Sequence, residues 1–257
     1  MLIKIQKYFT DCGVLSRRAA EEAIKRGEVT VNGARAELGM RIETDSDVVE
    51  YRGKRLKSSS NPKICIMLNK PRGFVTTMAD EKGRRSVDML VSEVGERIYP
   101  VGRLDMDSDG LLLMTNDGEL ANMLTHPRHS IPKIYKVWVK GSLTDENMRI
   151  LRSALVIDGY KIRPVKSVIL KNAEHERGFS VIEMTLFEGR NRQIRKMCAM
   201  AGLEVDRLSR IAYGSLRLGD LPEGRWRKLT DAEIKYLKSS SPTQPNKQTN
   251  SKKIKRT

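Results

Sequence analysis

The sequence predicts an α+β protein in which a small N-terminal αα-β module precedes a larger domain with a mixed, mainly antiparallel sheet and flanking helices. Strand-like apolar runs outnumber the stretches with helical spacing of apolar residues. A stretch rich in Lys, Arg, Ser, Asn and Pro separates the two parts, as expected of a flexible linker. We therefore expect a module at 1–52, a linker at 53–62, a main domain at 63–238 and a disordered basic tail at 239–257.

The N-terminal module begins with two predicted helices. Ile5 and Phe9 lie four residues apart, on one face of a first short helix. Ser16 is a suitable N-cap for a second helix over 17–26. Asn32-Gly33, between two short strand-like runs, predicts a hairpin. The module should therefore place a small sheet after its two helices.

The larger domain alternates strand-like and helical stretches. Ile194, Met197 and Cys198 lie at helical spacing and should face a core. Thr230 and Glu233 form a capping box for a last short helix. We expect strands at 64–68, 111–114, 134–139 and 181–187, and helices at 118–125, 145–154 and 191–201.

The charge of the chain points to a polyanionic partner. Lys and Arg number 48 against 32 Asp and Glu, a net charge of +16. The segment 239–257 holds five of the basic residues and no acid, so +11 remains on the rest. Nucleic-acid phosphates are the usual counterpart of such an excess, although a basic protein with solvated charged faces would show the same totals. The cations of the N-terminal module that could contact such phosphates are Lys7, Arg17, Arg18, Lys25 and Arg26.

Other features narrow the setting. The three cysteines, Cys12, Cys65 and Cys198, form neither a disulfide framework nor a zinc pattern, which favours a reduced cytoplasm. No apolar stretch is long enough to span a membrane. Lys4 and Lys7 interrupt what would be the apolar core of a signal peptide. We expect a cytoplasmic protein without membrane contact, and a monomer by default.

The densest signal is the segment from Val101 to Leu113, which carries Asp105, Asp107 and Asp109. A calcium loop of the EF-hand type needs Glu at its twelfth position, but counting from Asp105 that position is Asn116. A polar turn between two strands explains the later residues well. It explains Asp105 less well, because phosphates would repel a carboxylate on an RNA-facing surface. A catalytic role gives that carboxylate a reason.

Ordered motifs along the chain resemble two known families. Residues 5–33, with Ser16-Arg17-Arg18 and Gly27 to Gly33, resemble the S4 RNA-binding module. Gly102-Arg103-Leu104-Asp105 resembles the signature of the RsuA/RluB family of ribosomal RNA pseudouridine synthases. The family's other motifs are matched by Asn69 to Gly73, Thr115 to Leu120, Lys133-Ile134-Tyr135 and Glu188 to Met197.

The resemblance implies an isomerase that breaks the N1–C1′ bond of a uridine and rejoins the base through C5. It implies that Asp105 attacks the ribose or abstracts a proton, and that Arg195 neutralises this carboxylate. It implies that Tyr135 packs on the base and that Arg103 helps to hold the opened RNA. No cofactor or metal is expected, because the isomerisation is redox-neutral and transfers no external group. Phosphate contacts are expected from Lys133, Arg190, Arg192 and Lys196.

The expected partner is ribosomal RNA, with the wording of the motifs favouring the large-subunit (23S) molecule over the small-subunit one. A non-catalytic RNA-binding or ribosome-assembly factor is the competing hypothesis. The S4 module and the net charge would serve it equally. Such a factor would have no use for Asp105, Tyr135 and Arg195 together.

Overall fold

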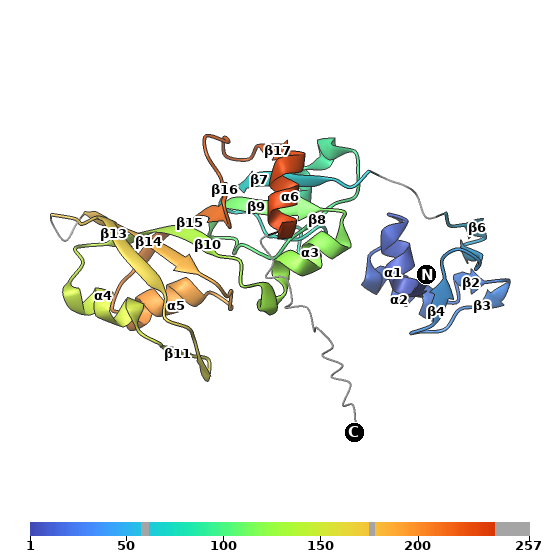
Figure 1. Ribbon diagram of the computed structural model, residues 1–257, viewed down its shortest axis with the longest axis horizontal. Coiled ribbons are helices and arrows are strands. Elements are labelled where there is room, and N and C mark those ends of the chain that lie inside the picture. Colours follow the sequence, from blue (N-terminus) through green and yellow to red (C-terminus); the bar gives the residue numbers. More distant parts are fainter. Residues whose placement is uncertain (58–61, 175–177, 240–257) are drawn as a thin grey trace, which may run out of the picture.

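The computed structural model describes residues 1–57, 62–174 and 178–239. Figure 1 shows a small N-terminal module and a larger domain built on one twisted sheet. Residues 58–61 of the predicted linker and 240–257 of the predicted tail lie outside the described residues. Within the described part, no helix is long and apolar enough to cross a membrane.

The N-terminal module packs two helices against short strands. The Ser16 hydroxyl accepts a hydrogen bond from the Ala19 amide at 3.1 Å, which confirms the predicted N-cap. Asn32 and Gly33 both have positive φ and make the predicted hairpin turn. The elements are β1 (Leu2–Lys4), α1 (Ile5–Asp11), α2 (Arg17–Lys25), β2 (Val29–Val31), β3 (Ala34–Arg35), β4 (Arg41–Glu43), β5 (Val49–Tyr51) and β6 (Lys54–Arg55).

The structure extends this module beyond the predicted boundary at residue 52. Strand β6 pairs with β5, and the Leu56 side chain joins the module's buried core. Leu56 is the only large apolar residue in 53–57, so the composition of this stretch predicted a linker where the structure has the second strand of a hairpin.

The described part of the larger domain contains a nine-stranded sheet. Seven strands follow the order β13-β14-β10-β15-β9-β7-β17, while β16 pairs with β15 and β8 pairs with β9. The strands predicted around 64–68, 111–114, 134–139 and 181–187 are all present. The strands are β7 (Cys65–Lys70), β8 (Tyr99–Pro100), β9 (Asp109–Thr115), β10 (Lys133–Lys140), β13 (Lys166–Lys171), β14 (Phe179–Leu186), β15 (Val205–Tyr213), β16 (Leu216–Arg217) and β17 (Trp226–Lys228). A separate hairpin joins β11 (Val156–Ile157) to β12 (Tyr160–Lys161).

In the described part of the larger domain, four α-helices flank this sheet, and each was expected from the sequence. The Thr230–Glu233 capping box forms at the start of the last one. The helices are α3 (Gly118–Thr125), α4 (Asp145–Arg152), α5 (Gln193–Met200) and α6 (Asp231–Ser239), with short 3₁₀ turns η1 (Val87–Leu90), η2 (Ser92–Val94) and η3 (Pro127–His129).

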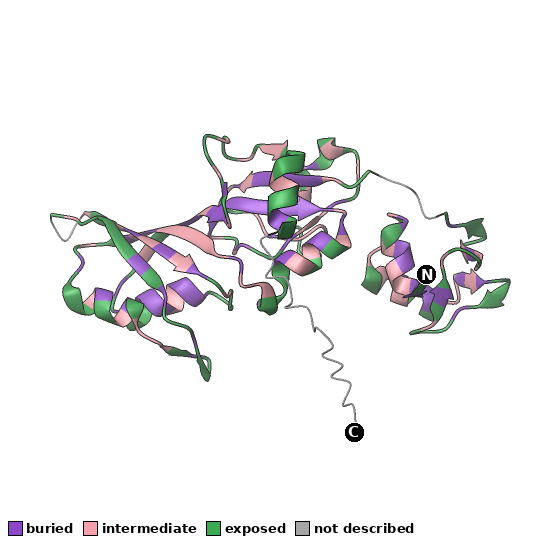
Figure 2. Ribbon diagram, viewed as in Figure 1, coloured by how far each residue is buried: buried purple, intermediate pink, exposed green. Residues whose placement is uncertain are grey.

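Separate apolar clusters stabilise the two halves of the sheet (Figure 2). Every residue of β9 is buried, and its side chains alternate between two clusters on opposite faces. This explains why β9 reads as a continuous apolar run. In the other half, β10 and β14 pack on α4 and α5, with Ile194, Met197 and Cys198 buried as expected.

The two halves join where β9 pairs in parallel with β15. Gly110 lies opposite Arg210 with φ at +103°. A Cβ atom at position 110 would collide with the carbonyl oxygen of Arg210. Glycine therefore permits this close approach of the strands. The junction places the loop that precedes β9 beside the start of α5.

Candidate active site

A buried lysine fixes the loop between β8 and β9, residues 101–108, through hydrogen bonds to its backbone. Lys70, at the end of β7, is fully buried. Its Nζ atom donates hydrogen bonds to the carbonyl oxygens of Pro71, Asp105 and Ser108 at 2.8–3.0 Å. Burial lowers the pKa of Lys70 to about 8, against the raising effect of nearby aspartates. Three accepting carbonyls match the three N–H groups of the charged ammonium.

Further contacts hold the same loop on the side of β7. The Thr76 hydroxyl donates to the Leu104 carbonyl at 2.6 Å. The Gly73 amide donates to the Met106 carbonyl at 2.7 Å. Because these bonds engage backbone atoms on both sides of Asp105, they fix the backbone from which its carboxylate projects.

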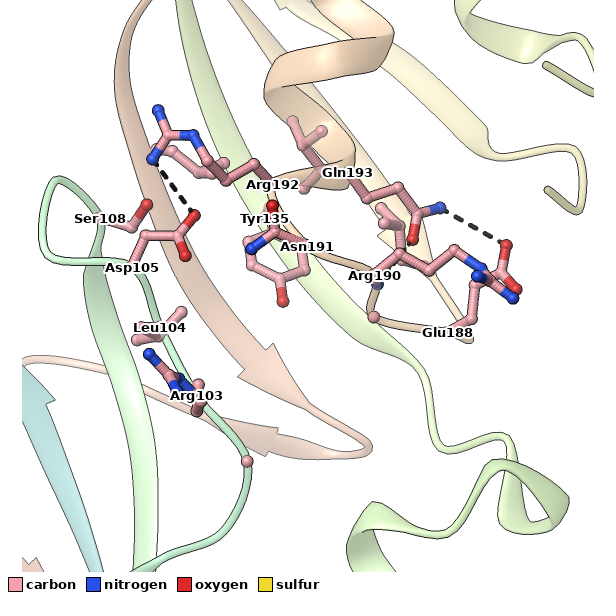
Figure 3. A pocket seen from close by; sticks show the side chains of 15 residues that line it. Arg103, Leu104, Asp105, Ser108, Tyr135, Glu188, Arg190, Asn191, Arg192 and Gln193 are labelled. Carbon is pink, nitrogen blue, oxygen red and sulfur yellow. Dashed lines mark hydrogen bonds and ion pairs between the residues drawn. The ribbon is translucent and has the colours of Figure 1, made fainter. Parts of the chain in front are cut away.

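Asp105 projects its carboxylate into a cavity of about 500 Å³. Its Oδ2 atom lies 3.7 Å from Nη1 of Arg192, and its side chain is 35% exposed (Figure 3). Arg192 adopts a left-handed backbone conformation, with φ at +51°, immediately before α5. Such strain costs about 1–3 kcal/mol and persists where surrounding contacts enforce it. Because the Asp105 side chain is partly exposed, the cavity offers a ligand access to a carboxylate that is already paired with a guanidinium.

Asp107, two residues further on, is the main partner of two guanidinium groups. Arg192 donates both of its terminal nitrogens to Asp107 at 2.9 and 3.2 Å, a forked charge-assisted pair. Arg195 places Nε 3.2 Å from the same carboxylate and donates Nη2 to the Asp107 carbonyl oxygen at 2.9 Å. Burial alone would raise the pKa of Asp107, but these two arginines leave the pKa below its ordinary value.

This arrangement corrects one expectation. The family resemblance implied that Arg195 neutralises Asp105, whereas the structure pairs Arg195 with Asp107 and brings Arg192 to Asp105. The register of the turn before α5 decides which guanidinium reaches the cavity. Arg195 lies in the first turn of α5, about one helical turn beyond Arg192, and is largely buried behind Asp107. Sequence motifs do not reveal that one-turn difference.

Other predicted residues line the same cavity. Tyr135 comes from β10 and is half buried, between the clusters of the two halves. Arg103 and Arg190 approach from the loop before β9 and the turn before α5 (Figure 3). The structure thus brings five of the predicted site residues to one cavity: Arg103, Asp105, Tyr135, Arg190 and Arg192.

The remaining predicted RNA-binding residues lie elsewhere. Lys133 lines a neighbouring cavity, and Lys196 forms an ion pair with Asp158. In the N-terminal module, three cations form ion pairs with nearby acids: Lys7 with Asp11, Lys25 with Glu22 and Arg26 with Glu28. Arg17 and Arg18 are exposed on α2.

The three alternate aspartates do not converge on one point. Asp109 is buried and pairs with Arg207, while Asp105 and Asp107 face Arg192. A calcium loop requires oxygen ligands around one cation, and here guanidinium groups occupy that role. Among the described residues, no group of three or more His, Cys, Asp or Glu side chains could hold a metal ion.

Sequence reasoning missed several residues that shape the site. A lysine two residues after the apolar run 64–68 was the available signal for Lys70. Ser108 was read as a turn residue, yet its hydroxyl is buried in the cavity wall without a hydrogen-bond partner. Arg210 is buried beside Tyr213 and donates Nε to the Leu111 carbonyl at 2.7 Å. Its position could not be inferred, because β15 was not predicted.

Comparison with known proteins agrees with this architecture. The family model described as RNA pseudouridylate synthase matches residues 64–200, and that of the S4 domain matches residues 13–49. The ribosomal large subunit pseudouridine synthase B of Bacillus subtilis is 42% identical over 92% of this chain and 96% of its own length. The dual-specificity RNA pseudouridine synthase RluF of Escherichia coli is 36% identical over 93% of this chain and 81% of its own.

A solved structure also matches most of the fold. The crystal structure of a pseudouridylate synthase covers 91% of this chain and 99% of its own, with a TM-score of 0.65 at 28% identity. The chain therefore belongs to the RNA pseudouridylate synthase family and carries an N-terminal S4 domain. It is an RNA pseudouridine synthase, an isomerase.

Proposed function

We propose that this chain converts a specific uridine of large-subunit (23S) ribosomal RNA to pseudouridine, with Asp105 as the catalytic carboxylate. The observation that carries the proposal is the position of Asp105, on a backbone-clamped loop, in an open cavity and 3.7 Å from a guanidinium. The Bacillus subtilis relative, named for the large ribosomal subunit, supports the choice of RNA.

Asp105 serves as the ionised group that starts the reaction. An aspartate carboxylate is charged at neutral pH and can act as a nucleophile or a base. Arg192 stabilises that charge when a substrate closes the cavity and excludes water. In the reaction the N1–C1′ bond breaks, the base turns, and a C5–C1′ bond forms. The proton leaves C5 and a proton is gained at N1, so atoms and electrons balance without a cofactor.

Tyr135 packs on the uracil ring and assists proton removal from C5. Its ring is half buried in the cavity wall, which suits stacking on a base. The target must leave its stack to reach Asp105, at a cost of a few kcal/mol that is smallest in unpaired RNA. Arg103 holds the opened strand, and the unpartnered Ser108 hydroxyl gains a hydrogen-bond partner from the substrate.

RNA affinity comes from both parts of the chain. The exposed Arg17 and Arg18, with the basic residues around the cavity, supply contacts to phosphates. Arg195 positions Asp107 and thereby the turn that carries Arg192. We also propose that the enzyme works in the cytoplasm, since its three cysteines are buried free thiols that suit a reducing compartment. We propose that it acts there as a monomer.

The test is direct. The purified protein is incubated with transcripts of the large- and small-subunit ribosomal RNA of its own cells, and pseudouridines are mapped at single-nucleotide resolution. We expect one or a few new pseudouridines in the large-subunit transcript. Modification confined to the small-subunit transcript would overturn the choice of RNA, and no modification of either would overturn the function.

A further inference from the structure

A second cavity adjoins the one that holds Asp105. Its volume is about 550 Å³, within the usual range of small-ligand sites. The two cavities share the stretch Glu188 to Asn191 as a common wall. Figure 3 shows Glu188 and Arg190 at the edge of the first cavity, on the side away from Asp105. A strand of RNA entering one cavity would therefore have the other beside it.

The second cavity offers flat surfaces for stacking. Phe187 follows β14 and is 44% exposed, and Tyr160, at the start of β12, is 42% exposed. The Arg190 guanidinium lies over the Tyr160 ring, with Cζ 3.1 Å from the ring centroid. Aromatic rings and guanidinium planes are the surfaces on which proteins stack unpaired bases.

The β11–β12 hairpin holds Tyr160 in this position. Ile157 pairs with Tyr160 in the hairpin and is itself buried in the core around α5. At the turn, Asp158 forms an ion pair with Lys196 of α5. These two contacts, one apolar and one ionic, hold the tip of the hairpin against the helix that follows Arg192. This makes Tyr160 part of a defined wall.

The cavity also presents cations suited to a phosphate. Arg163 is exposed and lines it, and Lys133 approaches from β10. The acids in the lining are engaged with the protein. Glu188 accepts a hydrogen bond from the Arg163 amide at 3.1 Å, and Asp158 pairs with Lys196. A ligand with an aromatic ring and an anionic group fits this combination, which is the chemistry of a nucleotide.

We propose that the second cavity binds an unpaired nucleotide that flanks the target uridine on the same RNA strand. Its base stacks on Phe187 and the Arg190–Tyr160 pair, and its phosphate contacts Arg163 and Lys133. This inference rests on the proposed function, because it assumes that the target uridine enters the cavity of Asp105. Phe187 and Tyr160 then become residues that select the RNA by its unpaired neighbours.

The experiment is a double-mutant cycle between protein and RNA. A short transcript spanning the mapped uridine is made intact and with the base of each flanking nucleotide removed in turn. Dissociation constants and single-turnover rates are measured for the unmutated protein and for Phe187→Ala. Phe179→Ala is the matched control, because Phe179 begins β14 and has the same 44% exposure at the opposite end of the strand.

One abasic position should weaken binding by the unmutated protein about tenfold, the scale of one stacked base. Phe187→Ala should weaken binding of the intact transcript by a similar factor, and the abasic lesion should then add little. Phe179→Ala should behave as the unmutated protein does. Independent, multiplicative losses, or equal behaviour of the two variants, would overturn the subsite.

The two proposals can fail separately. If the unmutated protein modifies the transcript but the cycle shows no coupling, only the subsite is refuted. If the unmutated protein makes no pseudouridine in any ribosomal RNA, the proposed function fails and the inference falls with it. The cycle is repeated with Tyr160→Ala, whose effect on binding should be coupled to the same abasic position.

Discussion

The Arg192 guanidinium lies 3.7 Å from the Asp105 carboxylate while its forked hydrogen bonds engage Asp107. One side chain therefore bridges the two carboxylates of this loop. Asp107, held also by Arg195, fixes the orientation of Arg192. The left-handed backbone at Arg192 is consistent with a position set by these contacts.

Arg192→Ala tests this link. Loss of a charge-assisted partner at the reacting carboxylate should lower the single-turnover rate by about 10²-fold, the scale of one electrostatic contact in a transition state. Arg192→Lys keeps a positive charge but loses the forked pair of hydrogen bonds. Its rate should therefore fall between that of the unmutated protein and that of Arg192→Ala. The matched control is Arg149→Ala, because Arg149 pairs with Glu146 on the exposed face of α4. Equal rates for Arg192→Ala and Arg149→Ala would refute a role for the contact.

Lys70→Met tests the clamp beneath the loop. The substitution leaves three carbonyl oxygens without their donor, and a buried unpaired group costs about 1–3 kcal/mol. We expect the free energy of unfolding to fall by about 3 kcal/mol in denaturant titration. Lys140→Met, which removes only an exposed pair with Glu204, should change it by less than about 0.5 kcal/mol. A similar stability for the two variants would show that the clamp contributes nothing.

We expect Lys133 to make RNA binding dependent on pH. Burial, together with the positive charge of Arg210, lowers the pKa of Lys133 to about 8. Phosphate binding needs the charged ammonium, so this contact is present below pH 8 and is lost as the pH rises through 8. We expect the dissociation constant for RNA to increase between pH 7 and pH 9, and Lys133→Arg to flatten that increase because arginine stays charged. A slope that Lys133→Arg leaves unchanged would assign the effect to another group.

Gly110→Ala tests the junction of the two half-sheets. The new Cβ atom would meet the Arg210 carbonyl oxygen, and the residue would hold φ at +103°. The strands β9 and β15 must separate to accommodate it, so we expect both a lower midpoint of thermal unfolding and lower activity. Gly83→Ala is the control, since Gly83 has φ at +67° with no atom near the added Cβ. It should cost only the backbone strain, about 1 kcal/mol.

The sequence was sufficient for elements whose signals are local. Ser16, Asn32-Gly33 and the Thr230–Glu233 box predicted their turns and caps, because capping and turn chemistry act over three or four residues. The motif containing Asp105 and the Lys-x-Tyr motif containing Tyr135 led to the cavity they share.

Features that depend on tertiary contacts were not predictable. The ion pair of Arg195 with Asp107 depends on where α5 begins relative to the loop before β9. Lys70 and Arg210 acquire their roles only when distant strands meet. Strand β6 has too little apolar content to stand out from a linker, and it is held in place because it pairs with β5 and Leu56 reaches the module's core.

The measurement that tests the central claim most directly is single-turnover conversion of the mapped uridine by Asp105→Asn, with RNA affinity measured on the same preparation. Asparagine keeps the shape of the side chain and removes its charge. We expect affinity within about threefold of the unmutated protein and no detectable pseudouridine, given the scale of losing a catalytic nucleophile. Conversion at a rate near that of the unmutated protein would contradict the assignment of Asp105.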